Sequence, residues 1–373
     1  MAQKLKLMTI LGTRPEIIRL SRVIKCADTY LNHILVHTGQ NWDHALYQVF
    51  FEDLDLRQPD YYLDSVGHDL GETMGNIIAK SYGVMQKEQP DAVLILGDTN
   101  SALSAISAKR LKIPIFHMEA GNRCWDMNVS EMINRRIVDH IADVNLPYTE
   151  HSRRCLISEG IDGKTVFVTG SPMQEVLNAY REKIISSNVL MRLGLTSGRY
   201  ILVSAHREEN IDIESNFTAL MTAINHIAET YQMPVIYSTH PRSMKFIQKR
   251  AFAFHPLVQN MTPFSFSDYN KLQMESFCVL SDSGTLSEES AMLHFPGVLI
   301  RTSTERPEVL DKGSLVIGGI KTGDVEQAVA LASSMREEPA AMPDDYADAN
   351  VSVKVVKLIQ SYTHIVNKAV WLK

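Results

Sequence analysis

The stretch LKLMTILGTRPE, residues 5–16, decides the fold class. Its first part, Leu5–Leu11, is mostly apolar, as expected of a strand that is buried on both faces of a parallel sheet. The GTRPE segment that follows contains Pro15, which is well tolerated in the first turn of a helix. A buried strand that runs through a polar loop into a helix predicts a β–α–β unit, and therefore an α/β protein.

Short apolar runs and longer helical patterns alternate along the rest of the chain. Further buried strands are expected at Ile34–Thr38, Ala92–Leu96, Ile115–His117, Val144–Leu146, Val166–Thr169, Tyr200–Ser204, Val235–Thr239, Cys278–Ser281 and Val298–Ile300. Helices are expected at Leu70–Met85, Ser101–Leu111, Met132–Ile141, Ser152–Ser158, Leu286–Leu293 and Val351–Ile365. Continuous apolar strands that alternate with helices are typical of a doubly wound parallel sheet.

The alternation pauses at the GSP stretch of residues 170–172 and then restarts, which divides the chain in two. We expect one Rossmann-like domain over residues 1–170, with a helix at about 356–373 packing back on it. A second Rossmann-like domain is expected over residues 171–355. Ligands of open parallel sheets bind beyond the carboxyl ends of the strands, so two such domains facing each other would bind a ligand in the cleft between them.

The composition fits a globular chain with two cores and restricts its partners. Of 373 residues, 45% are hydrophobic and 21% are charged, so disorder is not indicated. The net charge of −6 argues against non-specific nucleic-acid binding. The four cysteines form no C-x-x-C pair, so neither a zinc site nor a disulfide framework is expected. Without a signal-peptide pattern or an apolar run that could span a bilayer, the sequence predicts a cytoplasmic protein with no membrane partner.

A candidate phosphate site lies at SDSGT, residues 281–285, between an expected strand and an expected helix. A helix start offers free N–H groups and a positive dipole end to an anion. Gly284 would let the backbone approach the anion closely, and the hydroxyls of Ser283 and Thr285 would donate hydrogen bonds. An ordinary Ser or Thr helix cap is the alternative, and these residues alone do not distinguish the two.

Other side chains are placed to hold the same ligand. Glu289, one turn into that helix, could bind a ribose diol, or could be an exposed acid that complements the helix dipole. Arg14, at the start of the first helix, could bind phosphate through two donors, or could be a surface arginine. His206 and His240 each follow a second-domain strand and could contact a diphosphate. A lone histidine would be read as an ordinary core or surface residue, but two histidines in equivalent positions favour a function in binding the diphosphate.

Three acidic residues form a candidate catalytic group. Asp98 and Glu119 follow expected first-domain strands, so we expect them to be neighbours at one edge of the sheet. Glu131 opens an expected helix. Carboxylates crowded in a cleft raise one another's pKa, which can provide one acid and one base near neutral pH. Each residue alone is explained by helix capping, whereas the three together, beside phosphate-binding candidates, favour catalysis.

Six ordered motifs resemble the non-hydrolysing UDP-N-acetylglucosamine 2-epimerase family. They are GTRPE at 12–16, GDT at 97–99, HMEAGxR at 117–123, ExxNRR at 131–136, DSGxxxEE at 282–289 and TERPE at 304–308. The resemblance covers essentially the whole chain. It implies two Rossmann-like domains in the arrangement called GT-B, a homodimer, and a reaction that uses neither a metal nor a nicotinamide cofactor.

The resemblance also implies roles for individual residues, in a site that binds a UDP-sugar. The residues implied to bind UDP are Arg14, His240, Ser283, Gly284, Thr285 and Glu289. The residues implied to be catalytic are Asp98, Glu119, Glu131 and His206, the last beside the diphosphate. Thr285 stands where the family usually has a second glycine.

Longer stretches resemble the capsule and O-antigen subgroup of this family. They are RLS at 19–21, HTGQN at 37–41, PDYYLD at 59–64, GNIIAKSY at 75–82, MEAGNRC at 118–124 and SAHREEN at 204–210. That subgroup converts UDP-2-acetamido-2,6-dideoxy-L-talose to UDP-N-acetyl-L-fucosamine, which becomes the expected reaction. Epimerisation of UDP-N-acetylglucosamine to UDP-N-acetylmannosamine is the alternative.

The implied chemistry follows from the weak acidity of the hydrogen at C2. Loss of UDP places positive character on C1 and makes the C2 proton removable, which predicts a 2-acetamido glycal intermediate and re-addition of UDP. The residues do not show which carboxylate is the acid and which is the base. Three other readings remain open: a GT-B glycosyltransferase, a hydrolysing epimerase and a non-catalytic nucleotide-sugar sensor.

Overall fold

The computed structural model describes residues 3–40, 44–124, 129–338 and 341–373, and it contains two compact units. Unit 1 is Met1–Ala179 with Asp344–Lys373, and unit 2 is Tyr180–Pro343. The expected boundary near residue 170 falls before helix α7 (Met173–Ala179), which packs against the first helix of unit 1. The returning segment begins at Asp344 rather than at about 356.

Unit 1 is built on a six-stranded, fully parallel sheet of order β3-β2-β1-β4-β5-β6. Its strands are β1 (Lys6–Leu11), β2 (Asn32–His37), β3 (Tyr61–Tyr62), β4 (Ala92–Leu96), β5 (Ile115–Met118) and β6 (Val144–Leu146). Every residue of β4 is buried, as is β1 after Lys6, because helices cover both faces of the sheet.

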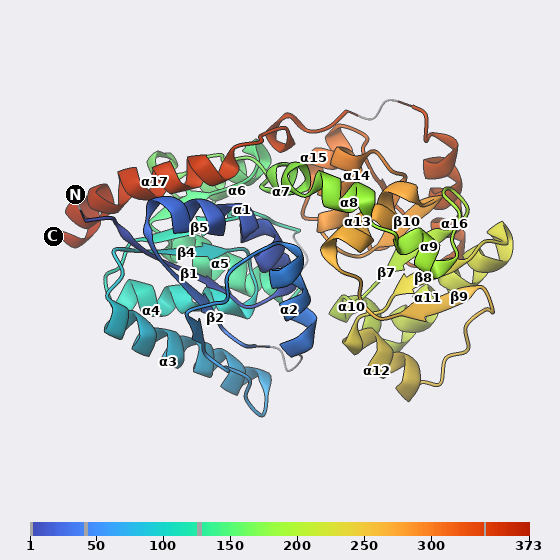
Figure 1. Ribbon diagram of the computed structural model, residues 1–373, viewed down its shortest axis with the longest axis horizontal. Helices are drawn as coiled ribbons and strands as arrows, with labels where there is room; N and C mark the ends of the chain where they lie inside the picture. The colour runs from blue at the N-terminus through green and yellow to red at the C-terminus, as the bar shows by residue number, and fades with distance from the viewer. Residues whose placement is uncertain (1–2, 41–43, 125–128, 339–340) are drawn as a thin grey trace. The chain divides into compact units, whose positions relative to one another are not determined.

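The helices of unit 1 form two layers. They are α1 (Arg14–Tyr30), α2 (His44–Asp53), α3 (Leu70–Glu88), α4 (Ser104–Arg110), α5 (Glu131–Ile141), α6 (Glu150–Ser158), α7 and α17 (Val351–Val366), with short 3₁₀ turns η1 (Asn100–Leu103), η2 (Gly163–Thr165) and η3 (Asp344–Tyr346) and a final π-turn η4 (Asn367–Trp371). The C-terminal helix α17 runs beside α1, while α3 and α4 pack together on the other side of the sheet (Figure 1).

Unit 2 repeats the design with the parallel order β12-β11-β10-β7-β8-β9. Its strands are β7 (Ile201–Ser204), β8 (Val235–Ser238), β9 (Val258–Met261), β10 (Cys278–Ser281), β11 (Gly297–Leu299) and β12 (Val316–Ile317). Its helices are α8 (Arg181–Ser186), α9 (Val189–Leu193), α10 (Glu208–Ile211), α11 (Glu214–Tyr231), α12 (Pro241–Lys249), α13 (Phe266–Glu275), α14 (Thr285–Leu293), α15 (Pro307–Asp311) and α16 (Thr322–Ser334).

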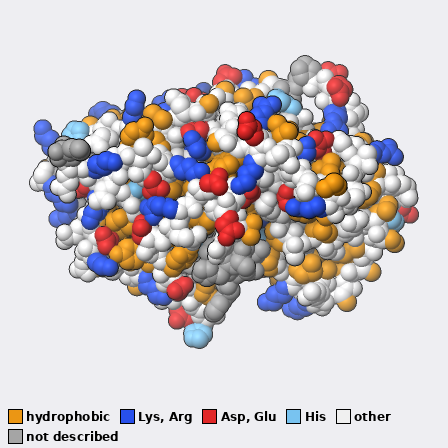
Figure 2. Space-filling view, viewed as in Figure 1, with side chains coloured by type: hydrophobic (Ala, Val, Ile, Leu, Met, Phe, Trp, Pro, Cys, Tyr) orange, Lys and Arg blue, Asp and Glu red, His pale blue; other side chains and the backbone are white. Residues whose placement is uncertain are grey.

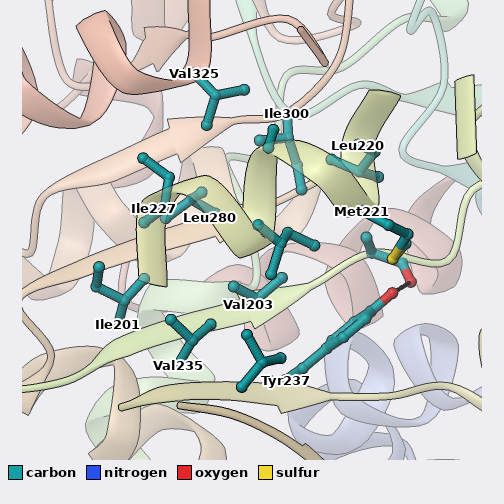
Figure 3. Close-up of a cluster of buried hydrophobic side chains, with 14 of the residues drawn as sticks. Ile201, Val203, Leu220, Met221, Ile227, Val235, Tyr237, Leu280, Ile300 and Val325 are labelled. Carbon is teal, nitrogen blue, oxygen red and sulfur yellow. Dashed lines mark hydrogen bonds between the residues drawn. The ribbon is translucent and has the colours of Figure 1, made fainter. Parts of the chain in front are cut away.

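Figure 3 shows the core of unit 2, in which strand residues such as Val203 and Leu280 pack against Leu220 and Ile227 of α11. Each fully buried aliphatic side chain of this kind contributes about 1.5–3 kcal/mol to folding. Tyr237 brings its hydroxyl into this core and donates it to the Ala205 carbonyl at 2.9 Å, so the polar atom is satisfied. The carboxyl ends of β7 and β8 are thereby fixed to each other.

The prediction of two doubly wound parallel sheets is confirmed, with local differences. No regular strand forms at Val166–Thr169, where one was expected. The segment has a single bridge, from Val166 to Asn145, and the N–H groups of Phe167 and Thr169 donate to the carbonyls of Asn145 and Pro147. The edge strands β3, β9 and β12 were not expected.

In the described residues, no helix combines the length and the apolar character needed to cross a membrane. On the face shown in Figure 2, basic and acidic side chains are interspersed rather than segregated.

Candidate active site

The loop after β1 leads directly into α1 and carries the first candidate, Arg14. Thr13 is the N-cap and Pro15 lies in the first turn, as its fixed φ favours. The guanidinium of Arg14 lies 5.6 Å from the ring centroid of Phe50 in α2, which holds it over an aromatic face. Glu16, two residues further on, is 1% exposed and faces the protein interior.

Asp98 follows β4 and is held by the helix that starts at Glu131. Its Oδ2 atom lies 2.7 Å from Nε and 2.6 Å from Nη2 of Arg135. Asn134 donates its side-chain amide to the Asp98 backbone carbonyl at 2.9 Å. One turn of α5 therefore fixes both the backbone and the carboxylate of Asp98, and this is a stronger constraint than the helix cap that the sequence also allowed.

Glu119 follows β5, the strand that pairs with β4, so the expected neighbourhood of Asp98 and Glu119 is present. Glu119 has a φ of +62°, which is rare for a residue other than glycine. Its Oε2 forms an ion pair with Nη1 of Arg19 in α1, and its Oε1 accepts from Asn122 at 3.3 Å. The carboxylate is thus aimed by α1 and by its own loop.

A buried charge cluster behind these loops holds their backbone. The fully buried Asp139 lies 2.9 Å from His117 Nδ1 and 2.8 Å from Arg123 Nη1, and it accepts from the backbone N–H of Gly121. His117 Nε2 is 2.8 Å from the Gly97 carbonyl, next to Asp98. Burial opposes the charge on His117, but Asp139 outweighs it and raises the pKa of the imidazole.

Glu131 is the first residue of α5, and its Oε2 accepts from the Ser130 hydroxyl at 3.1 Å. The structure connects Glu131 to Asp98 through Arg135: Glu131 begins α5, and Arg135, one turn later in the same helix, binds Asp98. All three acids therefore belong to one edge of the unit 1 sheet or to the helix attached to it. Residues 125–128, which precede Ser130 in the loop from Glu119, lie outside the described residues.

In unit 2, the two candidate histidines lie together. His206 follows β7, and His240 follows β8 as the N-cap of α12, so they end adjacent strands. Their ring centroids are 5.5 Å apart. His240 Nδ1 accepts from the Arg242 backbone N–H at 3.2 Å, and this hydrogen bond fixes its tautomer, with any proton on Nε2.

Asp282 organises the backbone around His206. This fully buried carboxylate accepts from the N–H groups of His206 and Arg207, each at 2.9 Å, and from the Asn210 amide at 3.1 Å. Burial raises its pKa despite these bonds. Asp282 therefore anchors the loop after β7.

The turn at residues 283–285 starts α14 with Gly284 as the N-cap. The Ser283 and Thr285 hydroxyls lie 3.0 Å apart. Gly284 has an ordinary helical φ of −62°, which any residue can adopt. A glycine matters here because it has no side chain, not because of its backbone freedom. A Cβ at this position would lie 2.8 Å from Glu305 Oε1, because Glu305 packs against the turn and holds Arg207 at 3.1 Å.

Glu289 is buried rather than exposed, which excludes the surface reading that the sequence allowed. Its Oε2 accepts from Gln273 Nε2 at 2.7 Å. The preceding Glu288 is also buried and lies 3.4 Å from Arg306 Nη2.

The four cysteines are free thiols, and across the described residues no group of three or more His, Cys, Asp or Glu side chains is placed to hold a metal ion.

Sequence reasoning missed the residues that hold the candidates in place. Chief among them are Glu16, Arg19, His117, Asp139 and Glu305. Several lie inside recognised motifs, such as GTRPE and TERPE, which was a usable signal. Their partners, however, lie far along the chain, as with Arg19 and Glu119, 100 residues apart.

Taken together, the two parallel sheets with helices on both faces define an α/β protein of the GT-B-like class. Residues 25–360 match the family described as UDP-N-acetylglucosamine 2-epimerase. The chain belongs to this family and is accordingly a UDP-sugar 2-epimerase, an isomerase that does not hydrolyse its substrate.

Individual relatives support this assignment over nearly the full length. The solved UDP-N-acetylglucosamine 2-epimerase of Rickettsia bellii is 44% identical, with a TM-score of 0.92 and full coverage of both chains. The Methanocaldococcus jannaschii enzyme, solved with UDP-GlcNAc and UDP, is 30% identical, with a TM-score of 0.90 and coverage of 96% of this chain and 100% of its own. A Pseudomonas aeruginosa UDP-2,3-diacetamido-2,3-dideoxy-D-glucuronate 2-epimerase is 32% identical over 95% of this chain and 100% of its own.

Proposed function

We propose that this enzyme inverts C2 of UDP-2-acetamido-2,6-dideoxy-L-talose to give UDP-N-acetyl-L-fucosamine, as a cytoplasmic homodimer that serves capsule or O-antigen synthesis. The sugar assignment is supported by the stretches at 19–21, 59–64, 75–82 and 204–210 that resemble that subgroup. The Pseudomonas relative, named for a different 2-acetamido sugar, is consistent with a family whose members differ in sugar but share the reaction at C2.

The chemistry proceeds by elimination and re-addition. The bond from C1 to the diphosphate oxygen breaks, a base takes the C2 proton, and a C1–C2 double bond forms. UDP then re-adds at C1 while an acid delivers a proton to the opposite face of C2. The catalysts must therefore stabilise the negative charge that the departing UDP gains and supply one base and one acid.

One observation carries the proposed acid–base roles: Asp98 and Glu119 end adjacent strands, and each carboxylate is held by an arginine. Glu131 would complete the group from the start of α5. Which of the three is the base and which the acid is left open. His206 would assist departure of the diphosphate, since it stands beside His240 and its N–H group donates to Asp282, just before the turn that starts α14.

UDP itself would be held by donors at the strand ends. The helix start at residues 283–285 offers N–H groups and two hydroxyls to phosphate. Arg14 and His240 would add charged or polar donors, and Glu289 would accept from the ribose. The N–H groups of Ser283 and Thr285 already donate to the hydroxyls of Ser281 and Ser283, at 3.1 and 3.4 Å, so a bound phosphate would replace these hydrogen bonds.

The named relatives favour a second candidate substrate, UDP-N-acetylglucosamine. Incubation of the enzyme with each UDP-sugar in D₂O, followed by NMR, separates the two. The proposed substrate should gain deuterium at C2 and yield its epimer without any acceptor. If UDP-N-acetylglucosamine exchanges and the talose derivative does not, the proposed sugar is wrong. If neither exchanges unless a sugar acceptor is added, a glycosyltransferase is favoured instead.

A further inference from the structure

Glu16 is a buried carboxylate whose two oxygens are surrounded by hydrogen-bond donors. Oε2 accepts from the Gly12 backbone N–H at 3.1 Å and from the Thr13 hydroxyl at 2.7 Å. The same oxygen accepts from the Thr99 hydroxyl at 3.1 Å, and Oε1 accepts from the Ser101 hydroxyl. A buried carboxylate is costly unless its oxygens are hydrogen-bonded, and here four donors satisfy both oxygens of Glu16.

These donors come from two different loops. Gly12 and Thr13 belong to the loop after β1, which carries Arg14. Thr99 and Ser101 belong to the loop after β4, which carries Asp98. The sequence T-x-x-E at residues 13–16 fits a helix capping box, in which the threonine side chain would accept from the helix. Thr13 makes no such bond and instead donates its hydroxyl to Glu16. The Glu16 carboxylate therefore binds the loop after β4 as well as the start of its own helix.

We propose that Glu16 is a positioning residue that couples the loop bearing Arg14 to the loop bearing Asp98, and so sets the diphosphate-side donor against the C2 acid–base group. The inference rests on the roles proposed above for Arg14 and Asp98. Glu16 is 1% exposed, so it acts through these residues rather than on the sugar. Displacements of about 1 Å between reacting groups can cost on the order of 100-fold in rate, so a coupling of this kind is worth testing by kinetics.

The two sides of Glu16 can be separated by removing one donor at a time. Thr13→Val removes a donor from the Arg14 loop only, and we expect weaker UDP binding with nearly unchanged C2 exchange at saturation. Ser101→Ala removes a donor from the Asp98 loop only, and we expect the opposite: native UDP affinity and slower exchange. UDP affinity is measured by calorimetry and exchange by NMR in D₂O.

Replacement of Glu16 itself tests the coupling. Glu16→Ala should lower the exchange rate constant about 10- to 100-fold per folded molecule and weaken UDP binding as well. Glu16→Gln should rescue both to within about threefold, because the amide oxygen can take the three donors and the Ser101 hydroxyl can turn to accept from the amide.

Glu175→Ala is the matched control. Glu175 is also a helical carboxylate of unit 1, and it accepts from the Ser352 backbone N–H at 2.8 Å, tying α7 to α17 away from both loops. It should lower the melting temperature but leave exchange and UDP affinity unchanged per folded molecule. If Glu16→Ala behaves like this control, or if Thr13→Val and Ser101→Ala both match the wild type, Glu16 is merely structural.

Failure of the inference can be told from failure of the proposed function. Arg14→Ala and Asp98→Asn are measured in parallel. If they impair UDP binding and exchange while the Glu16, Thr13 and Ser101 variants do not, only the positioning role is overturned. If Arg14→Ala and Asp98→Asn are themselves native in both assays, the roles on which the inference depends are wrong. Should Glu16→Ala fail to fold, Thr13→Val and Ser101→Ala decide the question.

Discussion

Arg135 binds one oxygen of Asp98 through two nitrogens, at 2.6 and 2.7 Å, although the two residues belong to a helix and a strand-end loop 37 positions apart. The carboxylate is thereby oriented before any ligand binds. A carboxylate held in this way on the active edge of a sheet can transfer a proton without first losing rotational freedom.

Amide replacements test the acids. Asp98→Asn, Glu119→Gln and Glu131→Gln keep size and most hydrogen bonding but remove proton transfer. All three should fold and bind UDP, and at least one should lose C2 deuterium exchange by about 10²–10⁴-fold, as measured by NMR.

Asp143→Asn is the control, because Asp143 binds Lys109 and the Ile115 backbone N–H at the opposite end of the sheet. It should affect stability and not exchange. Native exchange in all three folded amide variants would mean that these acids serve only as structural caps.

Space at residue 284 should control UDP affinity. Gly284→Ala places a methyl group against Glu305 and should move that carboxylate, Arg207 and the start of α14. We expect UDP binding to weaken in calorimetry. Gly323→Ala adds the same methyl group at the start of α16, where no atom beyond the adjoining backbone lies within 4 Å of the added Cβ, and should bind UDP normally. Equal affinities in the two variants would argue against a phosphate role for the α14 start.

Chelation tests whether protein donors alone carry the leaving group. Since the proposed mechanism places the charge of the departing diphosphate on Arg14, the histidines and a helix start, exchange should survive exhaustive EDTA treatment. The assay is the same NMR exchange before and after dialysis. Loss of activity that Mg²⁺ or Mn²⁺ restores would favour a metal-dependent transferase.

The pH dependence of the free energy of unfolding should reveal the raised pKa of Glu16. Burial raises the pKa of this carboxyl to about 7, although four hydrogen bonds partly offset the effect. The folded state therefore binds the proton more tightly than the unfolded state, so the contribution is full below about pH 4.5 and is lost as pH rises to about 7. Glu16→Gln should remove this decline, worth about 3 kcal/mol, in urea unfolding at several pH values. An unchanged pH profile would contradict the raised pKa.

Asp139→Asn should destabilise unit 1. It removes a buried charge that faces both His117 and Arg123, at a cost of about 3–5 kcal/mol or roughly 6–20 °C in melting temperature. Because Asp139 raises the pKa of His117, its contribution is full below about pH 6.5 and falls as pH rises through the folded pKa. The variant should therefore lose more stability at pH 6 than at pH 9 in scanning calorimetry. An equal loss at both would show that His117 does not titrate with Asp139.

The sequence was sufficient for the sheets where burial is continuous. The strands β4, β6 and β10 have the residues expected, because apolar runs bounded by polar loops leave few alternatives. Two-residue edge strands such as β3 carry too little periodicity to be seen. Val166–Thr169 has strand-like residues and lies along the end of β6, but it forms only one bridge and no regular strand.

The same distinction holds at the candidate site. That Asp98 and Glu119 share one edge follows from parallel topology alone, so the sequence could predict it. The arginine partners could not be predicted, because Arg19 and Glu119 meet only once α1 has packed on the sheet. The burial of Glu289 was also hidden, since an acid near the start of a helix is usually solvated.

The return of the chain to unit 1 has a consequence for synthesis on the ribosome. Unit 2 is continuous, from Tyr180 to Pro343, whereas α17, which covers α1, is translated only after it. About 320 residues separate the end of α1 at Tyr30 from the start of α17 at Val351, so at about 5–20 residues per second the face of α1 that α17 covers waits roughly 15 to 65 seconds. During that interval nascent unit 1 lacks its last helix and stays accessible to chaperones and proteases, and the unit synthesised second is the first that can be completed.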